Sequence, residues 1–141
     1  MDKTVRIRSG RDIGFSKSTL KLSSQDLANK IANLSLEKKA SDILILDLRP
    51  LTSMTDFFVI CCGSTNVQVK AISDHIFDQL KKEKIRPWHI EGYSNQEWIL
   101  LDYVDVVAHI FQPHKREFYG LERLWGDADT LEVKDEPNES A

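Results

Sequence analysis

The chain has 141 residues, of which 41% are hydrophobic and 29% charged, and its formal net charge is -3. This length suits one domain, and the composition is that of a globular protein rather than a disordered or collagen-like one. The negative balance excludes the strong positive field by which basic domains are drawn to nucleic acid. No stretch reaches the roughly 18 apolar residues of a membrane span, and the first 20 residues lack the apolar core of a secretory signal.

The two ends differ in charge from the middle of the chain. Residues 1–22 contain six Lys and Arg residues among Ser and Gly, and we interpret them as a flexible basic arm. A mitochondrial transit peptide is the alternative, although Asp2 and Asp12 and the lack of an amphipathic period speak against it. Residues 131–141 are acidic and polar, which predicts a disordered tail. The folded domain is therefore expected to span residues 23–130.

The first half of this domain predicts two helices and two strands. Ser23 and Ser24 can cap a helix that continues through apolar residues at helical spacing. Residues 43–48 and 57–62 are short apolar runs, each followed by a Pro or Gly, and they predict buried strands. Ser64 or Thr65 can cap a second helix. Its apolar stripe consists of Val69, Ile72, Ile76 and Leu80.

The second half predicts three further strands, at residues 85–90, 97–103 and 106–111. Pro113 ends the last strand, and Phe118, Leu121 and Trp125 then recur at intervals typical of a short C-terminal helix. Short connections between neighbouring strands force some of them to be antiparallel. The prediction is an α/β fold with a mixed five-stranded sheet flanked by helices.

Cys61 and Cys62 are the only cysteines, and they are adjacent in an apolar run. Neighbouring side chains on a strand point to opposite faces, so these two thiols are badly placed to form a disulfide or to chelate a metal together. We expect both to be buried as small apolar side chains, which fits a reducing compartment.

Two arrangements of polar residues could form catalytic sites. His89 and His109 with Asp102 and Asp105 offer metal-ligand chemistry, but their spacing does not favour a metal site. Gly63 and Ser64 lie between a strand and a helix, as in the phosphate-holding turn of nucleotidyltransferases. Those enzymes also need paired carboxylates for magnesium, and residues 66–68 here are Asn, Val and Gln. Nucleotidyl transfer remains the alternative among enzymes.

Residues 85–111 combine aromatic and acidic side chains, with four Asp and Glu residues against one Arg. In the strand predicted at 97–103, Trp98 and Asp102 share one face and Ile99 and Tyr103 share the other. One face must pack on the core. The other face is then available to a partner, and its composition is that of an interface hot spot. The alternative is that helices cover both faces.

Residues 47–49, 55–60, 63–68, 98–103, 109–111 and 116–125 closely resemble the Iojap family of ribosomal silencing factors. The matching blocks occur in the same order and spacing across residues 22–127. The resemblance implies a fold akin to nucleotidyltransferases without their catalytic carboxylates, no cofactor and no enzymatic activity.

The resemblance also implies a partner and a mechanism. The protein would bind the large ribosomal subunit through its ribosomal protein fourteen and sterically block the small subunit, which represses translation under nutrient limitation. It implies a bacterial cytoplasmic location, with mitochondrial or chloroplast relatives that assist large-subunit assembly, and allows a homodimer in the free form. The contact residues carried over by position are Trp98, Ile99, Asp102, Tyr103, Asp105 and His109. Val104 stands where the family usually has Gly, which predicts an altered turn.

Overall fold

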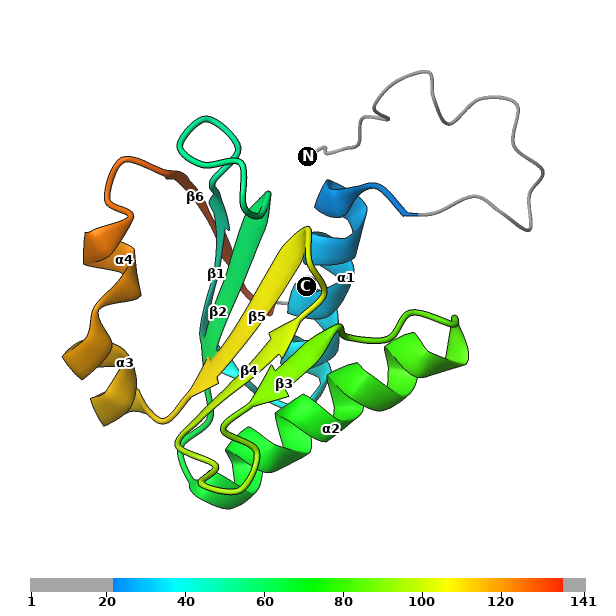
Figure 1. Ribbon diagram of the computed structural model, residues 1–141. Helices are drawn as coiled ribbons and strands as arrows, with labels where there is room; N and C mark the ends of the chain where they lie inside the picture. Colours follow the sequence, from blue (N-terminus) through cyan, green and yellow to red (C-terminus); the bar gives the residue numbers. More distant parts are fainter. Residues whose placement is uncertain (1–21, 136–141) are drawn as a thin grey trace, which may run out of the picture.

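A six-stranded mixed sheet organises residues 22–135, the part of the chain that the computed structural model describes (Figure 1). The strands are β1 Ser41–Asp47, β2 Phe57–Cys62, β3 His89–Glu91, β4 Trp98–Asp102, β5 Val106–Phe111 and β6 Asp129–Val133. Their order across the sheet is β3-β4-β5-β2-β1-β6, and only β2 and β5 run parallel. The predicted α/β class and mixed sheet are confirmed.

Two long helices begin at the caps expected from the sequence. Helix α1 spans Ser24–Glu37, and the Ser23 hydroxyl oxygen accepts a hydrogen bond of 3.0 Å from the Asp26 amide. Helix α2 spans Asn66–Lys82, and the Thr65 hydroxyl oxygen accepts one of 3.1 Å from the Gln68 amide. Each cap satisfies an amide that has no partner within the first turn of its helix.

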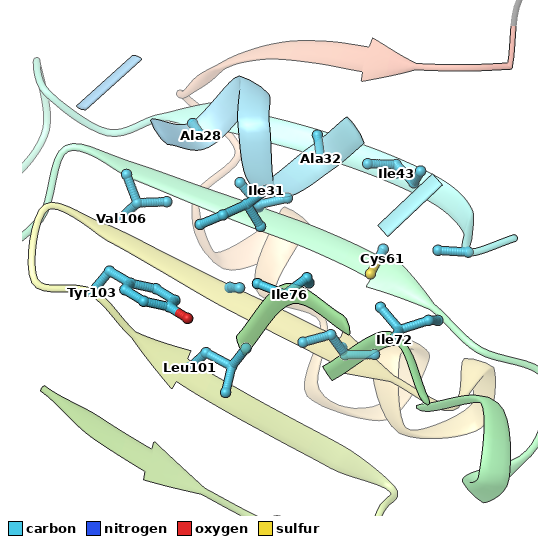
Figure 2. Close-up of a cluster of buried hydrophobic side chains, with 14 of the residues drawn as sticks. Ala28, Ile31, Ala32, Ile43, Cys61, Ile72, Ile76, Leu101, Tyr103 and Val106 are labelled. Atoms are coloured by element: carbon cyan, nitrogen blue, oxygen red, sulfur yellow. The ribbon is translucent and has the colours of Figure 1, made fainter. Parts of the chain in front are cut away.

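The main core lies between these two helices and one face of the sheet (Figure 2). Cys61 lies in this core, and its burial raises the pKa of the thiol to about 12, so the thiol is inert as a nucleophile at neutral pH. The labelled residues of Figure 2 come from both helices, four strands and the β4–β5 turn: Ala28, Ile31, Ala32, Ile43, Cys61, Ile72, Ile76, Leu101, Tyr103 and Val106. The expected burial of both cysteines is confirmed.

A smaller apolar cluster lies on the opposite face of the sheet. Helices α3 Pro113–Tyr119 and α4 Leu121–Leu124 pack there, on the other side of the sheet from α1 and α2 (Figure 1). Leu121 and Trp125 contact buried side chains of β1, β2 and β5. The side chains that β4 places on this face are only half-buried, so α3 and α4 do not fully cover the part of the sheet formed by β4.

Three details of the predicted elements were wrong. The sheet has six strands rather than five, because residues 131–133, expected in the acidic tail, pair with β1 as part of β6. The strand expected at 85–90 is reduced to β3, since Pro87 has no amide hydrogen to donate to a neighbouring strand. The single C-terminal helix is two short ones separated by Gly120, which has a φ of 55°.

The basic arm expected at the N-terminus and the end of the acidic tail lie at residues 1–21 and 136–141, outside the described residues.

Candidate functional site: an open groove on the sheet

A largely apolar groove of about 490 Å³ lies on the sheet face that α3 and α4 leave uncovered. Strands β2, β4 and β5 form its floor, and the loop before β2, the residue before β3, the β4–β5 turn and the end of α4 form its rim. We call this the open groove. It is lined by Thr52, Met54, Thr55, Phe58, Trp88, Leu100, Asp102, Val104, Val107, His109 and Trp125.

Strand register explains why these floor residues lie together. Leu100 of β4 is paired with His109 of β5, and Asp102 is paired with Val107. On the other side of β5, Phe58 of β2 is paired with Val107. Residues two apart on a strand share a face, so these pairs place five side chains side by side on the uncovered face.

His109 lies beneath the groove in a box of aromatic rings. Its Nδ1 accepts a hydrogen bond of 3.1 Å from the Trp98 indole N–H, so the neutral ring carries its hydrogen on Nε2. The Phe58 and His109 ring centroids are 4.4 Å apart. Only 4% of His109 is exposed, and this burial lowers the pKa of the imidazole to about 3. The imidazole is therefore neutral at physiological pH and unsuited to proton transfer there.

Trp98 is held in place from several sides. Its ring stacks on Phe111 with a centroid separation of 4.8 Å and lies 4.6 Å from the ring of Tyr119 on α3. Together with the hydrogen bond to His109, these contacts fix one rotamer of the indole. Trp98 thus supports the groove from its side, rather than standing free in solvent.

The β4–β5 turn is tight and strained at Val104. The Tyr103 carbonyl accepts a hydrogen bond of 2.9 Å from the Asp105 amide, and Val104 between them has a φ of 75°. These are the features of a classic γ-turn, which is rare for a residue with a side chain. An Asp102 carboxylate oxygen accepts a hydrogen bond of 2.8 Å from the Val104 amide and braces the turn.

The six residues expected at the contact surface divide between the two faces of the sheet. Asp102 lines the open groove, with Trp98 beside it and His109 in its floor. Asp105 is exposed in the turn and does not line the groove. Ile99 and Tyr103 are 0% and 7% exposed on the helix-covered face, so in this conformation their side chains cannot touch a partner.

Tyr103 illustrates how closed that second face is. Its ring lies among the core residues of Figure 2. Its hydroxyl is buried with no hydrogen-bond partner, and burial raises the pKa of the phenol. The structure therefore resolves the two alternatives for the β4 strand: helices cover the face of Ile99 and Tyr103, and the face of Asp102 is open.

Sequence reasoning missed several side chains that line the open groove. Met54 comes from a loop with no periodic pattern, and Phe58 and Val107 belong to strands whose apolar residues fit a covered sheet equally well. Trp125 was predicted as a helix residue without a target surface. Only the alternation along β4 gave a signal for the open face.

The turn that resembles a phosphate-binding loop is closed by a side chain of the protein itself. Gln68 accepts hydrogen bonds from the Ser64 amide at 2.8 Å and the Ser64 hydroxyl at 2.9 Å. Its amide nitrogen donates to the carbonyl oxygens of Lys38 and Lys39. The amide that would face a phosphate is thus already bonded, and Gln68 ties the start of α2 to the end of α1.

Residues 22–135 offer neither a cluster of metal ligands nor a membrane-spanning helix. Within this range, no three His, Cys, Asp or Glu side chains lie close enough to hold a metal ion. None of the helices described is long and apolar enough to cross a membrane.

Comparison with known families identifies the chain's relatives. A sequence model of the family described as "Ribosomal silencing factor during starvation" matches residues 21–141. The chain belongs to the ribosomal silencing factor family. A silencing factor from Halalkalibacterium halodurans is 36% identical over 113 residues, which cover 80% of this chain and 97% of the relative.

The fold agrees with this family membership. A crystal structure of a protein from Chromobacterium violaceum superimposes with a TM-score of 0.72 at 29% sequence identity, covering 85% of this silencing factor and 94% of that chain. A relative from mouse named mitochondrial assembly of ribosomal large subunit protein 1 is 32% identical over 98 residues. Those residues cover 67% of this chain but only 43% of the mouse protein, which is longer.

Proposed function

We propose that this silencing factor binds the large ribosomal subunit through the open groove, in the bacterial cytoplasm, and prevents the small subunit from joining. The partner on the large subunit is ribosomal protein fourteen, and the outcome is repression of translation when nutrients are limiting. The observation that carries the proposal is an apolar groove left uncovered on one sheet face of a chain that belongs to this family.

The chemistry of the groove suits a protein partner with basic residues. Asp102 is the one charged residue that lines the groove, because the imidazole of His109 is neutral. Asp105 is exposed in the turn next to the groove. An apolar centre with charge at the rim is the usual anatomy of a protein interface. Ribosomal proteins are commonly basic, so acidic residues at the rim complement them and favour correct orientation.

The mechanism requires no chemical step. A bound domain that buries a standard interface of roughly 1,600 Å² occupies space that the joining subunit needs. The proposal that the protein is not an enzyme draws support from Gln68, which occupies the turn where a nucleotidyltransferase would hold phosphate. The fraction of ribosomes silenced then follows the occupancy of the site.

Assistance in large-subunit assembly is the second candidate, because the mouse relative carries that role in its name. Both functions require contact with the large subunit. The contact acts during subunit assembly in one case and on finished subunits during starvation in the other. Cells that lack the gene would accumulate immature large subunits if assembly were the main role. They would have normal subunits, but a higher fraction joined during starvation, if silencing were the main role.

Sedimentation with separated ribosomal subunits tests the proposal. The parent protein should comigrate with large subunits and not with small ones, and it should reduce subunit joining as measured by light scattering. Leu100→Glu places a charge on the groove floor and should abolish both effects. Leu131→Glu is the matched control, because Leu131 is half-exposed on β6 at the far edge of the sheet. Comigration with small subunits alone would refute the proposal.

A further inference from the structure

Val104 has a backbone conformation that its side chain disfavours. Four other non-glycine residues among those described also have positive φ, namely Lys39, Asp42, Lys84 and Gln96, but none of them is branched at Cβ. For a β-branched residue, a φ of 75° is a genuine outlier, because Cβ crowds the following carbonyl. Glycine would hold the same turn without this strain.

Burial of the Val104 side chain does not offset that strain. It is 53% exposed, so the protein's own core gains little from it. It lies at the rim of the open groove with Met54 and Trp88, which are 84% and 76% exposed. These three side chains form a lip of apolar surface above a floor that is itself apolar. We call Met54, Trp88 and Val104 the apolar lip.

Residues held in strained conformations persist where function uses them, and exposed apolar clusters mark sites of association. We propose that Val104 is a specificity-determining contact residue, and that the apolar lip receives an apolar side chain of the large-subunit partner next to a lysine or arginine. The inference rests on the proposed function and adds which residue contributes affinity and what the partner presents.

Charge at the lip selects this kind of partner. Asp102 lines the groove below Val104, and Asp105 is exposed immediately after it. An apolar side chain of the partner can contact the lip while a neighbouring lysine or arginine lies near these two carboxylates. A partner segment with acidic residues at that position is disfavoured, because its negative charges would be brought close to the carboxylates.

Opposite effects on stability and binding distinguish this role from a structural one. Val104→Gly removes the strain and should raise the melting temperature by about 3 °C, after allowance for the greater freedom of glycine in the unfolded chain. The same change removes the side chain from the contact and should weaken binding to purified large subunits by roughly tenfold. Val104→Ala keeps Cβ and the strained φ, so it should weaken binding severalfold without the gain in melting temperature.

The matched control is Gln96→Gly, which removes a positive-φ side chain at the other end of β4. Gln96 has a φ of 61° and does not line the open groove. This variant should bind large subunits like the parent.

The outcomes separate the two proposals. If the parent does not bind large subunits, the proposed function fails, and this inference fails with it. If the parent binds and Val104→Gly binds equally well, only the inference is overturned. A lower melting temperature for Val104→Gly would also overturn it, because the turn would then not be strained. Weaker binding of Gln96→Gly to the same extent would show a general effect of glycine and count against Val104.

Discussion

At the scale of single residues, His109 couples the groove to the stability of the fold. Its imidazole is neutral and buried in the folded protein, where the Trp98 N–H and the ring of Phe58 surround it. In the unfolded chain the same imidazole is hydrated and titrates near its ordinary pKa of 6.5. Acid therefore favours the unfolded state through this one side chain.

The sign and size of this effect can be tested. The stabilisation due to neutral His109 is fully present above about pH 6.5 and is lost as the pH falls toward the folded pKa of about 3. Between pH 7 and pH 5 the free energy of unfolding should fall by about 2 kcal/mol from this group. Urea unfolding at both pH values measures it, and His109→Phe should lack this part of the loss. An equal loss in parent and variant would show that His109 is not its source.

Sequence reasoning predicts the two faces of β4, but the contact residues carried over from the family resemblance come from both faces. Alternation along β4 correctly separates Trp98 and Asp102 from Ile99 and Tyr103, because the period of a strand is fixed by its backbone. The contact list nevertheless included Ile99 and Tyr103, since a match to a family motif runs along the chain and does not distinguish faces. The altered turn at Val104 stays a prediction, because the residue has a φ of 75°, a conformation that glycine also adopts.

At the scale of elements, the accuracy of the predictions follows the strength of each local signal. Strands β2 and β5 are continuous apolar runs bounded by clear breakers, and both begin and end as expected. Strand β6 was missed, because Asp129–Val133 contains only two apolar residues and takes its shape from pairing with β1. An edge strand of this kind depends on a neighbour that local sequence does not reveal.

The contribution of β6 can be measured by truncation. A chain that ends at Glu136 and a chain that ends at Ala128 differ in whether β6 is present. Loss of β6 removes the pairing of five residues with β1. It also exposes the core side chains against which Val133 packs. We expect the shorter chain to be less stable by about 2 kcal/mol or more in urea unfolding, and to associate through the open β1 edge in size-exclusion chromatography. Equal stability of the two chains would assign β6 no structural role.

At the scale of the whole molecule, net charge and local charge act in different directions on ribosome binding. The chain carries a net charge of -3, and ribosomal RNA is a polyanion, so the two repel one another at long range. The proposed contact of Asp102 and Asp105 with basic residues attracts at short range. Salt screens both, but once the complex has formed, the short-range pairs contribute most to its stability.

Affinity for large subunits should therefore fall as salt rises, by roughly fivefold between about 50 and 300 mM, as expected for two exposed ion pairs. Asp105→Asn removes one of these charges and should reduce the loss to roughly twofold. Asp78→Asn makes the same change in net charge on an exposed position of α2, the helix on the opposite side of the sheet from α3 and α4. Its salt dependence should stay close to that of the parent, because Asp78 lies outside the proposed contact. Since both variants lose one negative charge, the difference between them measures the contribution of charge at the groove. If the two variants showed the same slope, charge at the groove would act only through the net charge of the molecule.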